Sequence, residues 1–99
     1  METMGVDEIL GEKRAEILRI AAKHGVTSIR VFGSVARGEA GPESDVDFLI
    51  EAGTTVTPWF PGGLVADLED LLGRHVDVVE RVALRPRLEP IVLAEAVPL

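Results

Sequence analysis

The segment 31-VFGSVARGEAGPESDVDFLI-50 joins two apolar runs through a polar stretch, and it decides the fold. The first run ends at Gly33–Ser34, and the second opens with the alternating residues Asp45–Asp47. Residues 38–44 carry two glycines and a proline, which is typical of a loop. Two strands joined by a loop of this length are expected to lie side by side, so the Gly-Ser pair should lie close to the two aspartates.

Helical and strand patterns alternate along the chain. Apolar residues recur at helical spacing in two long segments, and each segment ends at a glycine that can stop a helix. The elements expected in chain order are a helix over 6–24 before Gly25, a strand over 26–33, a helical turn over 35–38, a strand over 45–52, a helix from 64 that stops at Gly73, a strand over 76–80, and a final helix opened near Pro86 and interrupted or restarted at Pro90. This order predicts an α/β (α+β) fold with a two-layer arrangement.

Length and composition limit the size and type of the core. With 99 residues, residues 1–99 are expected to form a single domain. Hydrophobic residues make up 46% of the chain and aromatic residues only 4%, so the core must be built mostly from Val, Leu, Ile and Ala.

The charge balance argues against nucleic acid as a direct substrate. The formal net charge is −7, whereas binding a phosphate backbone relies on clustered Lys and Arg. An acidic surface suits solubility or a basic protein partner. The chain has no cysteine, lacks an apolar run of about 20 residues that could span a bilayer, and shows no signal-peptide pattern at its start. We therefore expect a cytoplasmic protein that does not bind membranes.

The Gly-Ser pair and the aspartates suggest phosphate and metal chemistry. Gly33 and Ser34 offer open backbone N–H groups and a hydroxyl to a phosphate group. In a strand, Asp45 and Asp47 point to the same face, where two carboxylates can hold Mg²⁺. A pair of solvated aspartates at the start of a strand is the simpler alternative. Arg37 is placed to offset triphosphate charge, and its alternative is an ordinary surface role.

A third carboxylate would allow two metal ions to act on one phosphoryl transfer. Asp77, near the start of the next expected strand, is the candidate, with Asp70 and Glu80 as alternatives. It could bind the second metal or take the proton of an incoming hydroxyl group.

Other polar and aromatic residues receive less specific interpretations. The two histidines, His24 and His75, lack paired ligand spacing, and we expect structural roles for both. The acidic residues of the 64–75 helix are expected to form a solvated face. The loop aromatics Trp59 and Phe60 either cover the sheet edge or anchor a partner, with the partner favoured. The cluster Arg81, Arg85 and Arg87 is either a mixed-charge surface or a contact for phosphate or an acidic patch.

The combined motif resembles a known family. Gly33–Ser34, ten intervening residues and Asp45–Asp47 are similar to the signature of the polymerase-beta-like nucleotidyltransferases, specifically the minimal nucleotidyltransferase family. Ala36–Gly38 and the Ser-Asp pair at 44–45 agree with the version found in that family, and 68-LEDLLGRHVDVVE-80 resembles its third-carboxylate segment. The resemblance runs from about Val26 to the C-terminal IVLAEAV.

The resemblance implies the polymerase-beta-like nucleotidyltransferase fold, a small mixed sheet packed with helices, and a transfer of AMP from ATP to a hydroxyl group. It assigns Gly33 and Ser34, with Arg37, to the nucleotide phosphates, and Asp45, Asp47 and Asp77 to catalysis and to two Mg²⁺ ions. Members of the family commonly act as antitoxins beside a helical HEPN ribonuclease toxin, and some adenylylate a tyrosine on it. The competing hypothesis is a non-catalytic antitoxin that neutralises its partner by forming a complex. Transfer to a small molecule is disfavoured, because such relatives carry acceptor domains.

Overall fold

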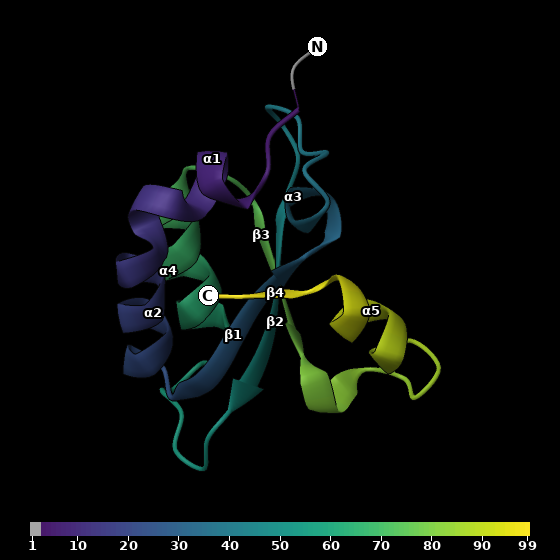
Figure 1. The fold of residues 1–99 in the computed structure, drawn as a ribbon. Coiled ribbons are helices and arrows are strands. Elements are labelled where there is room, and N and C mark those ends of the chain that lie inside the picture. Colours follow the sequence, from purple (N-terminus) through teal and green to yellow (C-terminus); the bar gives the residue numbers. More distant parts are fainter. Residues whose placement is uncertain (1–2) are drawn as a thin grey trace.

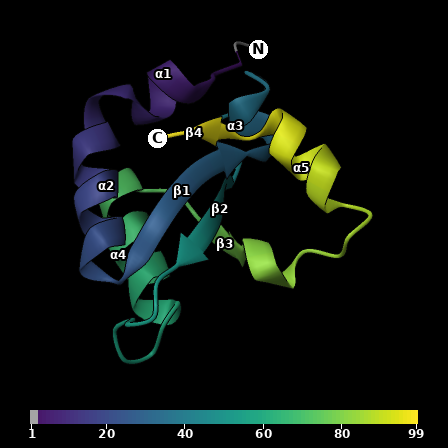
Figure 2. The same ribbon diagram turned by 60° about the horizontal axis from the view of Figure 1, so that its bottom comes forward.

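The computed structural model describes residues 3–99 as a four-stranded sheet with helices on both sides (Figure 1). Both views place α2 and α4 on one side of the strands and α5 on the other, with α3 at one end of β1 (Figure 2). The elements are α1 (Val6–Leu10), the 3₁₀ turn η1 (Gly11–Lys13), α2 (Arg14–Lys23), β1 (Val26–Phe32), α3 (Gly33–Ala36), β2 (Val46–Ala52), α4 (Gly62–Leu72), β3 (Val76–Glu80), the 3₁₀ turn η2 (Arg81–Ala83), α5 (Glu89–Glu95) and β4 (Val97–Pro98).

The sheet is mixed, in the order β3-β2-β1-β4. β1 runs antiparallel to β2 and to β4, whereas β2 and β3 run parallel. The pairing of Phe32 with Asp47 puts the end of β1 beside the start of β2, as the loop length predicts. The mixed α+β architecture that the resemblance implies is therefore confirmed.

Two differences from the expected elements have physical causes. The helix expected over 6–24 is divided into α1 and α2 by the 3₁₀ turn that begins at Gly11. Glycine in a helix interior is unfavourable, which permits this break. The strand β4 was not expected, because two residues have no readable periodicity; its Pro98 is tolerated because β4 lies at the sheet edge.

The final helix begins at Glu89 with Pro90 in its first turn, so a start at Pro90 rather than near Pro86 is the correct reading. Proline is favoured in the first turn of a helix, where its missing N–H would have no partner. The helix α4 ends as expected, with Gly73 in the left-handed conformation at a φ of 64°.

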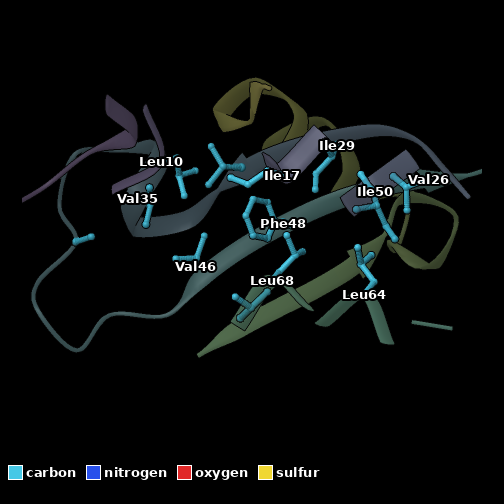
Figure 3. Packing of buried hydrophobic residues seen from close by; sticks show 14 residues of the cluster. Leu10, Ile17, Val26, Ile29, Val35, Val46, Phe48, Ile50, Leu64 and Leu68 are labelled. Carbon is cyan, nitrogen blue, oxygen red and sulfur yellow. The ribbon is translucent and has the colours of Figure 1, made fainter. Parts of the chain in front are cut away.

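The core lies between the sheet and the helices α1, α2 and α4 (Figure 3). Phe48 of β2 is fully buried between Leu68 of α4 and Ile17 of α2 (Figure 3). Along β2, Val46 and Ile50 point to this same side, because strand side chains alternate. The intervening Asp45, Asp47, Leu49 and Glu51 therefore belong to the opposite side of the sheet, toward the C-terminal segment.

The loop aromatics 59–60 separate in the structure. Phe60 packs against the core, whereas the side chain of Trp59 is 91% exposed. Within residues 3–99, no helix is long and apolar enough to cross a bilayer.

Candidate active site

The parallel register of β2 and β3 groups the predicted carboxylates. Val46 pairs with Val76 and Asp47 pairs with Asp77. Both valines are buried in the core, so the aspartates, one residue further along, point to the opposite side of the sheet. Asp45 lies one residue before the valine pair and therefore shares the face of Asp47. Of the alternatives for the third carboxylate, Glu80 pairs with Ile50 further along, and Asp70 is exposed on α4.

The loop that leads into β2 is fastened to the segment before β3. The Arg74 guanidinium donates to the backbone carbonyls of Gly41 and Ser44, at 2.9 and 3.1 Å. The Val46 N–H donates to the His75 carbonyl at 3.0 Å. These bonds hold the backbone on both sides of Asp45, and they thereby fix the backbone position from which the Asp45 side chain extends.

Gly33 lies directly against the site, as its spacing in the sequence predicts. It opens α3 with a φ of 75°, a left-handed conformation that side chains disfavour. A Cβ atom added to Gly33 would overlap Asp47 Oδ2 and lie 3.2 Å from Asp47 Cγ. Residue 33 must therefore lack a side chain for the Asp47 carboxylate to occupy its place. Ser34 follows in the same turn.

Burial, together with the neighbouring carboxylates, raises the pKa of Asp47 above its ordinary value of 3.8. Burial is the largest cause, and the charges of Asp77 and Asp45 add to it; the positive charge of Arg37 acts in the opposite direction. The surroundings of Asp47 thus disfavour its ionised form. A bound cation would relieve this cost, and carboxylate oxygens are the ligands that Mg²⁺ prefers.

His75 joins the carboxylates, which its expected structural role did not predict. One ligand atom each from Asp45, His75 and Asp77 lie within 4.8 Å of one another, close enough to share a metal ion. His75 Nδ1 lies 3.4 Å from Asp45 Oδ2. The donor set fits a divalent cation. The spacing of His75 two residues before Asp77, on one face of a strand, is the signal that could have revealed it.

The other residues predicted to contact nucleotide are joined to the C-terminal helix. The Gly33 N–H donates to Glu95 Oε2 at 3.2 Å, and the Arg37 guanidinium donates to the second oxygen of the same carboxylate. Arg37 Nε also donates to Glu39 at 2.8 Å. The Glu95 carboxylate of α5 therefore accepts hydrogen bonds from two groups, the Gly33 N–H and the Arg37 guanidinium, that the sequence predicts to bind phosphate. Nothing in the sequence marks Glu95.

The second histidine lies away from this site, next to the start of α4. His24 is only 5% exposed, and its ring nitrogens lie 2.6 Å from Thr57 Oγ1 and 2.7 Å from Asp67 Oδ2. The bond to His24, helped by Lys23, lowers the pKa of Asp67 below its ordinary value. Asp67, expected on a solvated face, stays partly exposed, but it also serves as the polar partner that the buried imidazole needs.

Comparison with known proteins agrees with this geometry. The profile of the nucleotidyltransferase domain family matches residues 14–99. A protein of Thermococcus cleftensis named protein adenylyltransferase MntA is 35% identical over 97 residues, which cover 98% of each chain. A Methanocaldococcus jannaschii protein described as a proposed protein adenylyltransferase is 38% identical over 88 residues, covering 89% of this chain and 95% of that one.

Solved structures show the same fold. The structure of a proposed minimal nucleotidyltransferase superposes with a TM-score of 0.84 at 45% identity and covers 97% of each chain. A toxin–antitoxin crystal structure with AMP-PNP gives a TM-score of 0.74 at 22% identity, covering 87% of this chain and 71% of that one. The match of the family profile to 14–99, together with relatives aligned over almost all of their length, places this chain in the nucleotidyltransferase domain family, among its minimal members.

Proposed function

We propose that this chain is a Mg²⁺-dependent protein adenylyltransferase that acts as an antitoxin, transferring AMP from ATP to a tyrosine hydroxyl group of a HEPN-type toxin. The observation that carries the proposal is the placement of Asp47 between Asp77 on the neighbouring strand and Gly33, the residue that follows β1 and opens α3. This geometry supports a site in which carboxylates and phosphate-binding donors face the same substrate.

The similar proteins support the protein acceptor. Two relatives are named as established or proposed protein adenylyltransferases. Structures that share the fold include a toxin–antitoxin complex with AMP-PNP and a complex of an antitoxin with a tri-AMPylated HEPN toxin of Shewanella oneidensis. The net charge of −7 also favours a protein acceptor over a nucleic acid.

In the proposed reaction the acceptor hydroxyl oxygen attacks the α-phosphorus of ATP. The new oxygen–phosphorus bond replaces the bond to the β-phosphate oxygen, and pyrophosphate leaves. The Gly33 N–H, Ser34 and Arg37 would hold the terminal phosphates. Asp77 would accept the proton of the hydroxyl group.

Asp45, Asp47 and Asp77 would hold the divalent cations, two of which are expected. The cations would supply neutralisation of the phosphate charge and a lower pKa for the attacking hydroxyl group. The raised pKa of Asp47 supports this assignment, because burial and then the charges of Asp77 and Asp45 disfavour its ionised form, and a bound cation would offset both effects.

The test is the intact mass of the toxin partner after incubation with ATP and Mg²⁺, using the natural chain or Asp47→Asn. We expect mass to be added in whole AMP units by the natural chain only. A stable complex with both forms and no added mass would instead support neutralisation by contact alone.

The Asp47→Asn variant should keep its fold, which makes it a fair test. A carboxyl group whose pKa is raised by folding lowers the stability of the folded state once the pH exceeds that pKa. Removing the Asp47 charge should therefore not reduce the midpoint of thermal unfolding at neutral pH. A lower midpoint would mean that any loss of transfer reflects unfolding.

A further inference from the structure

Four polar residues at the start of β2 and β3, of which Asp45 and His75 each lie one residue before the strand, form two adjacent pairs. Asp47 is paired in register with Asp77, and His75 lies 3.4 Å from Asp45 through Nδ1. Because Val46 and Val76 turn into the core, all four polar side chains start from the same side of the two strands. His75 thus completes a cluster whose other members are the proposed metal ligands.

The second ring nitrogen of His75 faces another carboxylate. Nε2 lies 3.9 Å from Glu69 Oε2, and this same oxygen accepts a hydrogen bond from the Val76 N–H at 3.0 Å. The backbone of β3 therefore fixes the Glu69 carboxylate beside the outer edge of the imidazole. At 3.9 Å the two atoms are too far apart for a hydrogen bond, but a small rotation of either side chain would let His75 Nε2 donate to Glu69, as metal-binding histidines commonly do to a carboxylate.

An imidazole changes which cations a carboxylate site prefers. Mg²⁺ is a hard cation that favours oxygen ligands, whereas first-row transition metals gain from a nitrogen ligand. A site that combines Asp45, Asp77 and His75 should therefore favour Mn²⁺ or Co²⁺ over Mg²⁺ more strongly than carboxylates alone would.

We propose that His75 is a metal ligand through Nδ1, that Glu69 is its positioning residue, and that this pair tunes the site toward transition-metal ions such as Mn²⁺. The inference rests on the proposed function only for the position of the metal. It concerns the binding of a cation by this chain alone, without ATP or a partner.

The experiment measures the dissociation constants of Mn²⁺ and Mg²⁺ by calorimetry for the natural chain and for His75→Ala. We expect His75→Ala to weaken Mn²⁺ binding about tenfold, since one ligand is lost, and to change Mg²⁺ binding less than about twofold. Glu69→Gln keeps an acceptor for the Val76 N–H and should weaken Mn²⁺ binding, although less than His75→Ala does; unchanged Mn²⁺ binding in this variant would overturn the positioning role of Glu69.

The chain contains a second histidine that serves as an internal control. On titration with Zn²⁺, the imidazole nitrogen resonances of His75 should shift, whereas those of the buried His24 should not. The proposal is overturned if His75→Ala binds Mn²⁺ within twofold of the natural chain, if Mn²⁺ and Mg²⁺ binding weaken equally, or if the His75 resonances do not move. Because no AMP transfer is measured, such a failure is distinct from failure of the adenylyltransferase proposal.

Discussion

At residue 33 the backbone passes so close to the Asp47 carboxylate that no side chain fits between them. The left-handed φ of 75° adds a second reason for glycine. Gly38, five residues later, has nearly the same φ of 74°, but an added Cβ would meet nothing within 4 Å. A comparison of alanine substitutions at the two glycines therefore separates the energetic cost of the left-handed backbone conformation from the cost of a steric clash with Asp47.

We expect Gly33→Ala to lower the free energy of unfolding by about 2 to 3 kcal/mol, because both costs apply. Gly38→Ala should lower it by only about 1 to 2 kcal/mol, since only the backbone cost remains. Urea unfolding measures both values. Gly33→Ala should also lose transfer, because Asp47 must move. Equal stability losses for the two variants would show that the contact with Asp47 carries no energy.

At the scale of elements, the side chain of Glu95 links the C-terminal helix α5 to the short helix α3 by hydrogen bonds. Glu95 accepts from the Gly33 N–H and from Arg37, both of which are proposed to bind phosphate. An anion held by the same donors as the substrate competes with it. The position of α5 relative to α3 should therefore influence how tightly ATP binds.

Glu95→Gln should tighten ATP binding about fivefold, corresponding to about 1 kcal/mol, because a negative charge leaves the donors that would take the phosphates. The dissociation constant of ATP, measured by calorimetry with Mg²⁺, checks this expectation. Glu39→Gln is the matched control, since Glu39 pairs with the same arginine at 2.8 Å but is bonded through Nε. The same gain in both variants would point to net charge rather than to competition at Gly33.

At the scale of the whole molecule, one core supports both strands that carry the site. Phe48 follows Asp47 directly and packs on the opposite side of β2, among residues of α2 and α4 (Figure 3). The burial of Phe48 fixes which face of β2 packs against the core, so Asp47 lies on the opposite face of the sheet. Trp59 illustrates the contrary case, a large side chain that the fold leaves in solvent.

Phe48→Ala should reduce the free energy of unfolding by about 3 to 5 kcal/mol, because it removes a fully buried aromatic ring and leaves a cavity. Trp59→Ala should change it by less than about 0.5 kcal/mol, since an exposed side chain contributes little to folding. Thermal and urea unfolding measure both. A large loss for Trp59→Ala would mean that the exposed ring stabilises its loop.

The elements with long, regular patterns were predictable. The strands around Phe48 and Val76 and the helix that ends at Gly73 were expected from alternation, helical spacing and a glycine stop. Short or interrupted elements were not predictable. The strand β4 has only two residues, and the 3₁₀ turn at Gly11 interrupts a continuous helical pattern. Local patterns need several repeats before they exceed chance.

The sequence by itself determined the class of fold and the spacing of Gly33–Ser34 from Asp45–Asp47, because both depend on the order of elements along the chain, and it predicted Asp77 as the third carboxylate with Asp70 and Glu80 as alternatives. Only the tertiary structure decided that His75 and Glu69 flank the carboxylates and that Glu95 lies on the Gly33 N–H, 62 residues away in sequence. These contacts depend on strand register and on how α5 packs across the sheet. Such long-range geometry is set by the fold as a whole and leaves no local pattern to read.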